Sequence, residues 1–269
     1  MKFLSLSLIF LFLACGGEQA AGEPPAAVKA DTAEPTAATP PPVTRPGEID
    51  MPEAGGSVSH QLWDELLQAH VSPSGEVDYP GFKKDEARLN RYLQKLADNP
   101  VQDGWSRNEK MAYWINAYNA FTVKLIVKNY LVSSIRDLHG GNPWDVEWIE
   151  LDDKSYTLNN IEHDILRPKF GDPRIHAVVN CAAQSCPPLH NHAYTADKLD
   201  QQLEQQTRQF INNPKYNKLS PDRVVISKIF KWYAEDFDNL IGFLNKYAEV
   251  EINKDAKVEY MGYSWKLNE

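Results

Sequence analysis

The sequence lacks the motifs that mark several common classes of enzyme. It contains no glycine-rich dinucleotide fingerprint, no phosphate-binding loop, no His-Glu-x-x-His and no Gly-x-Ser-x-Gly. These absences disfavour nucleotide cofactors and phosphoryl transfer. Positive charge is also scarce, because 28 lysines and arginines stand against 37 aspartates and glutamates. The net charge of −9, without a basic patch, argues against nucleic acid as a partner, since binding it requires a positive field.

Cysteine is rare, with three residues in a chain of 269. In an exported protein an odd cysteine needs an explanation of its own, and Cys15 has one. Lys2 precedes an apolar run over residues 3–14, which is too short to span a bilayer, since that takes roughly 20 residues. The run is typical of a secretory signal. Leu13-Ala14-Cys15-Gly16 resembles a bacterial lipobox, which implies cleavage before Cys15 and a lipid on that cysteine.

We therefore expect residues 1–14 to be a signal peptide and the lipid on Cys15 to anchor the protein to the membrane. Gly16 follows the cysteine in place of aspartate, which favours the outer membrane of the bacterial cell envelope, facing the periplasm or the cell surface. The alternative is an ordinary signal peptide with an incidental cysteine. Residues 15–56 are expected to form a disordered tether, because residues 24–46 contain seven of the 18 prolines and no aromatic residue.

Residues 57–269 have the composition of a folded domain and contain all seven tryptophans. Ser106 and Glu109 have capping-box spacing, and the apolar residues after them predict a helix over residues 106–130. Further helices are predicted over residues 60–70, 85–97, 159–166, 196–211 and 227–247. Extended segments are predicted over residues 77–82, 174–181, 224–226 and 258–265, with a hairpin formed by residues 148–151 and 156–158. The expected fold class is α+β, a helix-rich single domain around a small, mostly antiparallel sheet.

Two cysteines close together, Cys181 and Cys186, are the most unusual feature of the domain. A disulfide between them would suit an oxidising compartment. Alternatively, a nearby imidazole from His163 or His176 would lower the pKa of one thiol and make it a nucleophile. A third interpretation is zinc, because these cysteines with His190 and His192 form a C-x4-C-x3-H-x-H pattern. Export and the unusual spacing weigh against zinc, and we expect neither a metal nor a cofactor.

Two asparagines also stand out, because asparagine is a poor helix former. Asn116 and Asn119 lie three residues apart on one side of the predicted central helix, beside Trp114 and Tyr118. Their amides either hold the fold together or contribute, with the two aromatic residues, to substrate binding. His176 is either a core histidine or a group that positions a substrate.

Several separated motifs resemble the domain-of-unknown-function 547 family in order and content. They are Trp114-Ile115-Asn116-Ala117-Tyr118-Asn119-Ala120, Ile161-Glu162-His163-Asp164-Ile165-Leu166-Arg167, the segment 176–189 and Ile229-Phe230-Lys231-Trp232-Tyr233-Ala234-Glu235-Asp236-Phe237. Gly75-Glu76-Val77-Asp78-Tyr79 and the C-terminal Tyr263-Ser264-Trp265-Lys266-Leu267-Asn268 resemble the two ends of the family pattern. The resemblance covers nearly all of residues 60–269. The family is similar in outline to papain-like and transglutaminase-like thiol enzymes, which implies a cysteine–histidine site.

That resemblance implies Cys181 as the nucleophile and His163 as the base, with Glu162 in the same motif as a supporting group. His190 and His192 lie outside the family pattern. The sequence departs from ordinary thiol hydrolases, because its central helix presents asparagines and its cysteines follow His163. A working site would therefore be permuted, or the fold has kept a pocket and lost catalysis.

The function expected is a cysteine-dependent hydrolase or acyltransferase that acts on an amide or thioester bond of a small substrate. One alternative is a non-catalytic binding module with a Cys181–Cys186 disulfide. Another is a thiol redox or glutathione-binding protein, whose substrate would be a small peptide or thiol.

Overall fold

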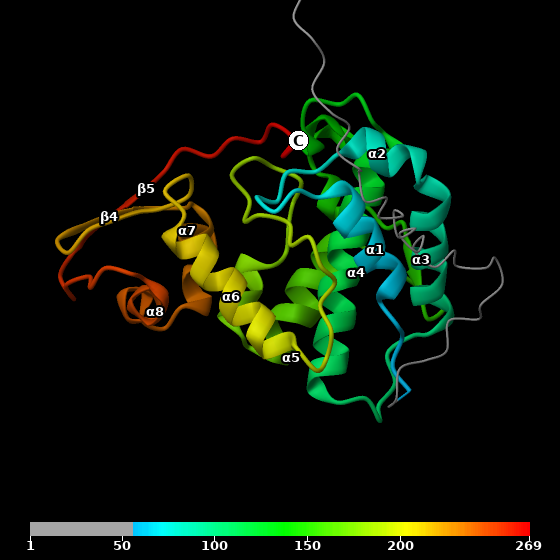
Figure 1. Cartoon of the computed structure of the whole chain (residues 1–269), viewed down its shortest axis with the longest axis horizontal. Helices are drawn as coiled ribbons and strands as arrows, with labels where there is room; N and C mark the ends of the chain where they lie inside the picture. The colour runs from blue at the N-terminus through cyan, green and yellow to red at the C-terminus, as the bar shows by residue number, and fades with distance from the viewer. Residues whose placement is uncertain (1–55) are drawn as a thin grey trace, which may run out of the picture. The chain divides into compact units, whose positions relative to one another are not determined.

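A computed structural model describes residues 56–269, and the helices and strands within them confirm the α+β class (Figure 1). The predicted signal peptide, Cys15 and nearly all of the predicted tether lie outside the described residues. The helices are α1 (Gln61–His70), α2 (Tyr79–Lys84), α3 (Glu86–Asp98), α4 (Arg107–Lys128), α5 (Arg167–Phe170), α6 (Leu199–Asn212), α7 (Ile229–Trp232) and α8 (Leu240–Tyr247). The strands are β1 (Ile149–Leu151), β2 (Lys154–Tyr156), β3 (Lys218–Leu219), β4 (Arg223–Ile226) and β5 (Lys257–Tyr260). None of the described helices combines the length and hydrophobicity needed to cross a membrane.

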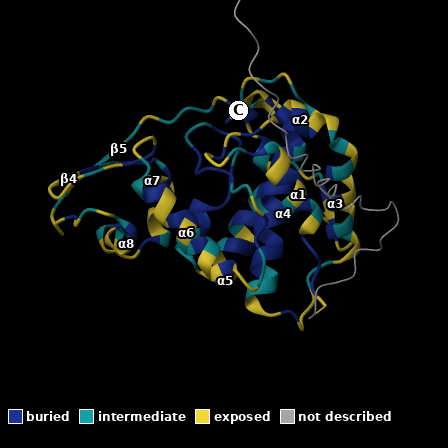
Figure 2. Ribbon diagram, viewed as in Figure 1, coloured by how far each residue is buried: buried dark blue, intermediate teal, exposed yellow. Residues whose placement is uncertain are grey.

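Helix α4 is the centre of the larger hydrophobic core. It begins as predicted, because the Ser106 side chain accepts from the backbone of Glu109 and the Glu109 side chain accepts from the backbone of Ser106. Nearly every residue from Met111 to Val127 is buried, as the dark ribbon in Figure 2 shows. A helix buried on all sides requires partners all round, and α2, α3 and the helical turn before α5 pack against it.

A second, smaller hydrophobic cluster lies between the three-stranded sheet and the last three helices, α6, α7 and α8. Phe210 and Ile211 of α6 pack there with Phe230 of α7 and Leu244 of α8. Strands β3, β4 and β5 cover this cluster, with β4 antiparallel to β3 and parallel to β5. The hairpin β1–β2 is separate and confirms the predicted hairpin, and Asp152 and Asp153 at its turn both have a φ of 54°. The fold therefore has two small sheets beside a helical core.

The segment 174–181 is not the predicted strand. Its first part forms a 3-10 helix over Pro173–Ala177, capped by the Asp172 side chain, which accepts from the backbone N–H of Arg174. The remainder is a loop. A short, continuous apolar run is compatible with a buried strand and with a buried helical turn, so the spacing of its apolar residues cannot decide between them. Here Pro173 and the cap at Asp172 favour a helical turn.

Three other expectations about local structure were also wrong. Residues 79–84 form α2 where an extended segment was predicted, because Asp78 caps them by accepting from Gly81. The predicted helix over residues 227–247 is broken into α7, a 3-10 turn and α8, and Asn239 caps α8. The helix predicted over residues 159–166 continues past Leu166, because Pro168 is tolerated in the first turn of α5, and the helix ends at Gly171 with a φ of 55°.

A buried histidine should make the stability of this fold sensitive to acid. His60 is buried, and its Nδ1 lies 2.8 Å from the Tyr92 hydroxyl. Burial, with a smaller contribution from Lys95, lowers its pKa to about 3. Below pH 6.5 the unfolded chain takes up a proton here and the folded chain does not. Stability is therefore lost as pH falls from 6.5 toward 3, by about 1.4 kcal/mol per pH unit.

The His60→Gln variant keeps a hydrogen-bonding side chain and removes the titration. We expect the loss of unfolding free energy between pH 7 and pH 4.5 to be about 2.5 kcal/mol smaller than in the wild type, as measured by urea unfolding at both pH values. His139→Asn, at an exposed histidine, is the control and should leave the pH dependence unchanged. Equal pH dependence in His60→Gln and the wild type would contradict the assignment.

Candidate functional site

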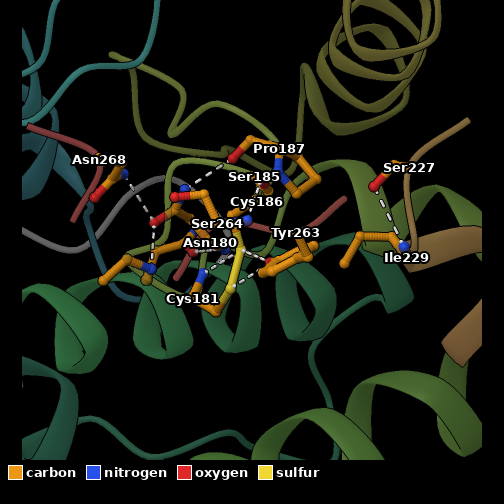
Figure 3. The surroundings of a disulfide bond; sticks show 12 residues. Asn180, Cys181, Ser185, Cys186, Pro187, Ser227, Ile229, Tyr263, Ser264 and Asn268 are labelled. Carbon is orange, nitrogen blue, oxygen red and sulfur yellow. Dashed lines mark hydrogen bonds between the residues drawn. A yellow bond between two sulfur atoms is a disulfide. The ribbon is translucent and has the colours of Figure 1, made fainter. Parts of the chain in front are cut away.

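Cys181 and Cys186 are joined by a disulfide, with their Cα atoms 6.1 Å apart (Figure 3). Of the three interpretations open from the sequence, this pairing is the one present in the structure. His190 and His192 lie elsewhere, and His192 Nδ1 is 3.1 Å from Asp64 Oδ1. Among residues 56–269, no three histidine, cysteine or acidic side chains are grouped so that they could hold a metal ion.

The loop that carries the disulfide is fixed by hydrogen bonds to Asn180. The Asn180 side chain donates to the carbonyl of Pro187 at 2.8 Å and accepts from the backbone N–H of Ala182 at 2.9 Å. The N–H of Cys181 donates to Cys186 Sγ at 2.9 Å. Cys186 is only 3% exposed, whereas Cys181 is half-buried. Of the two sulfur-bearing side chains, that of Cys181 is therefore the more accessible.

A cavity of about 210 Å³ lies over this disulfide. It lies between the two hydrophobic clusters, since Tyr118 belongs to the larger cluster and Tyr233 packs against the smaller one. Polar and sulfur-bearing side chains on its wall come from Asn159, Glu162, His176, Cys181 and Cys186. Aromatic side chains supply most of the rest, from Tyr118, Trp144, Trp232, Tyr233, Tyr263 and Trp265.

His176 is the histidine that lines the cavity. Its Nε2 lies 2.6 Å from Asp236 Oδ2, and its Nδ1 is buried without a hydrogen-bond partner. Asp236 also accepts two hydrogen bonds from the guanidinium of Arg167, at 2.7 and 2.8 Å. Asp236 is acceptor-only when ionised, so Nε2 carries the proton and Nδ1 keeps its lone pair.

The pKa values of this pair support a neutral imidazole beside a carboxylate. Burial lowers the pKa of His176 below its usual value, and the carboxylates of Glu162 and Asp236 oppose that shift only in part. Burial alone would raise the pKa of Asp236, but the hydrogen bonds from Arg167 and His176 hold it below its usual value. At neutral pH His176 is therefore an oriented base with one ring nitrogen, Nδ1, that has no hydrogen-bond partner.

Glu162 brings a carboxyl group into the same cavity. Its side chain is buried and interacts with the hydroxyls of Tyr118 and Tyr233. Burial, reinforced by Glu162, raises the pKa of both tyrosines well above the usual value, so both hydroxyls stay protonated. No ion pair to Glu162 exists among the described residues.

The structure does not place His163, the predicted base, on the cavity wall. Its Nδ1 lies 2.9 Å from the guanidinium of Arg167, and its ring stacks on Tyr233 with centroids 6.0 Å apart. His176 stacks on the same tyrosine at 4.0 Å and does line the cavity. The role of His163 as a base stays a prediction, but the geometry favours His176.

The two asparagines of α4 bind backbone rather than facing the cavity. Asn119 donates to the carbonyl of Val178 at 2.9 Å and accepts from the N–H of Asn180 at 2.8 Å. Asn116 makes the same two-sided contact with the backbone of Tyr194, at 2.8 and 3.0 Å. Trp114 packs on Tyr156 away from the cavity, so Tyr118 is the one predicted binding residue of α4 that lines it.

The last residues of the chain complete the site, although the sequence placed them only in the family resemblance and not in the site. The segment 263–268 runs from the three-stranded sheet back to the cysteine loop, where the N–H of Gln184 donates to the carbonyl of Lys266 at 2.8 Å and Asn268 donates to Asn180 at 3.2 Å. The Tyr263 hydroxyl lies 3.2 Å from Cys181 Sγ and 3.4 Å from Cys186 Sγ. We call this segment the C-terminal strap.

Asp236 was missed as well, although it lies in one of the motifs quoted for the family resemblance. The motif grouped it with aromatic residues and gave no sign of a histidine partner 60 positions earlier. The available signal was the tyrosine and tryptophan content of residues 229–237 and 263–265, which is high for two short segments.

Comparison with known proteins yields one match. A family model described as "Protein of unknown function, DUF547" matches residues 102–211, which include α4, Glu162, His176 and both cysteines. No curated protein and no solved structure gives a significant match. The match over residues 102–211 supports the DUF547 family for this chain, as its motifs predict.

Proposed function

We propose that the domain carries out thiol–disulfide exchange between a small thiol and the Cys181–Cys186 bond. The observation that carries the proposal is the disulfide on the wall of an otherwise aromatic cavity, with Cys181 more exposed than Cys186. In such exchange the attacked sulfur must be accessible and the leaving sulfur must be stabilised as a thiolate.

The reaction begins when the thiolate of the small molecule attacks Cys181 Sγ. A mixed disulfide forms at Cys181 as the Cys181–Cys186 bond breaks, and the electron pair of that bond leaves on Cys186 Sγ. The backbone N–H of Cys181 and the Tyr263 hydroxyl are close enough to donate to this thiolate. Nδ1 of His176, which has no hydrogen-bond partner, accepts the thiol proton. Attack by Cys186 on Cys181 Sγ reverses the step and releases the thiol.

The proposed location fits this chemistry. We infer from the N-terminal sequence that the protein is exported and anchored through Cys15 to the outer membrane, where disulfides persist. A protein held there meets small thiols and disulfides outside the reducing cytoplasm.

The two single cysteine variants should behave differently toward a small disulfide. Cys186→Ser leaves the accessible Cys181 thiol, and Cys181→Ser leaves the buried Cys186 thiol. With 2-hydroxyethyl disulfide we expect Cys186→Ser to form a mixed disulfide at least about tenfold faster, because exchange rates depend on access. Intact mass with peptide mapping measures the adduct. Equal rates, a faster Cys181→Ser, or no adduct on either variant would contradict the proposal, and no adduct would favour the non-catalytic binding module.

A second candidate function is favoured by the pairing of His176 with Asp236. When the disulfide is reduced, Cys181, His176 and Asp236 supply a nucleophile, a base and a group that orients the base, as in papain-like thiol enzymes. Cys181 would then attack an amide or thioester carbonyl, and His176 would return the proton to the leaving group. This hydrolase or acyltransferase requires a reduced chain, whereas exchange begins from the oxidised chain.

A further inference from the structure

One buried acidic side chain in the site, Glu162, has no basic partner among the described residues. Glu162 is 4% exposed, and among residues 56–269 it forms no ion pair with a lysine, arginine or histidine. The nearest arginine in sequence, Arg167, is already engaged by Glu235 and Asp236. Buried carboxylates are costly unless a cation or several hydrogen bonds compensate them. Two tyrosine hydroxyls provide part of that compensation.

The cavity beside Glu162 has aromatic walls. Trp265 contacts Trp144 with ring centroids 5.4 Å apart and Tyr263 at 4.7 Å, and Tyr263 contacts Trp232 at 4.6 Å. Trp232, at the rim, is 46% exposed, which is unusual for so large a side chain. Aromatic rings attract cations through their negative faces, and cages of such rings bind quaternary ammonium groups.

We propose that the cavity is a binding site for an alkylammonium group, in which Glu162 supplies the countercharge and Trp144, Trp232, Tyr263 and Trp265 supply the cage. At about 210 Å³ the cavity is smaller than the ~300–1,000 Å³ of pockets for drug-sized ligands, so it takes a headgroup rather than a long chain. The chain's net charge of −9 also favours the approach of a cation.

The inference also names a substrate class for the exchange reaction, and for that part it rests on the proposed function. Glu162 and Cys181 line the same small cavity. A thiol that carries an ammonium group a few bonds from its sulfur would therefore bind Glu162 and reach Cys181 together. Neutral thiols would lack the first contact, and anionic thiols would be repelled by Glu162.

The test uses choline, which has the ammonium group and no sulfur, against its neutral carbon analogue 3,3-dimethyl-1-butanol. On the oxidised full chain we expect choline to bind at least about tenfold more tightly in calorimetric titration, and to change tryptophan fluorescence. This comparison needs no variant. It is also independent of sulfur chemistry, so exchange without choline binding would overturn this inference alone.

Two variants locate the charge. Glu162→Gln, which is nearly isosteric, should reduce the preference for choline over the alcohol to about twofold or less. Glu147→Gln removes an exposed carboxylate three residues from Trp144 that does not line the cavity, and it should keep the preference. Equal binding of the two ligands by the wild type, no binding of either, or a preference unchanged in Glu162→Gln would overturn the proposal.

Discussion

Replacing His176 with glutamine is expected to slow the reaction of small thiols with the Cys181–Cys186 bond by about 100-fold at pH 7, the lower end of the range for a general base. Glutamine keeps an amide that can donate to Asp236 but offers no basic nitrogen to the cavity. Stopped mixtures analysed by mass spectrometry give the rate. The corresponding variant His163→Gln should react at the wild-type rate, because His163 does not line the cavity.

The pH dependence of the rate distinguishes loss of the base from a structural defect, because a structural defect would slow His176→Gln at every pH. His176 acts as a base only while neutral, and burial holds its pKa below 6.5. The advantage of the wild type over His176→Gln should therefore persist at pH 7 and disappear as the pH falls through that lowered pKa. If His163→Gln reacts slowly and His176→Gln reacts at the wild-type rate, His163 rather than His176 would be the base. Thioester hydrolysis by the reduced wild type, lost in His176→Gln, would support the acyl-transfer candidate.

The largest effect on stability is expected from Asn119→Leu, which should lower the free energy of unfolding by about 4 kcal/mol. Leucine fills a similar volume but leaves the carbonyl of Val178 and the N–H of Asn180 without partners. Each unsatisfied buried group costs about 1–3 kcal/mol. Urea unfolding of the oxidised chain measures the change.

The matched control for Asn119→Leu is Thr122→Val, one turn further along α4. The Thr122 hydroxyl is buried and has no hydrogen-bond partner, so its removal should change the free energy of unfolding by less than about 1 kcal/mol or increase it. If both substitutions lower the free energy of unfolding by the same amount, the hydrogen bonds of Asn119 to Val178 and Asn180 would not explain the effect. The structural role given to the Asn119 amide would then be wrong.

The predictable parts of this fold are those in which local sequence and burial agree. Helix α4 has a capping box, a long apolar face and no proline, and its observed start follows the predicted cap at Ser106. The helix predicted over residues 227–247 has an equally apolar face but is broken. Asn239 caps a new helix there, while Asp236, in the turn before it, binds Arg167 and His176. Local periodicity contains no information about those distant partners.

The candidate site divides in the same way. Cys181, Cys186, Glu162, His176 and Tyr118 were predicted from the sequence and do line one cavity. Asp236 and the strap could not be predicted, because their roles depend on pairings across about 60 to 90 positions. Asn116 and Asn119 illustrate a different limit of sequence analysis. Asparagine is unusual within a helix, so both residues were expected to be important, but only their hydrogen bonds to the backbone show that their role is structural.

The C-terminal strap also determines the order in which the site is assembled. If the chain is exported from its N-terminus, as we propose, Cys181 and Cys186 reach the oxidising compartment about 80 residues before Tyr263, Lys266 and Asn268, which later hold their loop in place. The two cysteines can therefore meet an oxidant while their loop is still unrestrained. The cavity wall forms only after residues 263–268 have been made, so a chain that stalls or is clipped before them would carry the disulfide without the pocket that gives it a substrate.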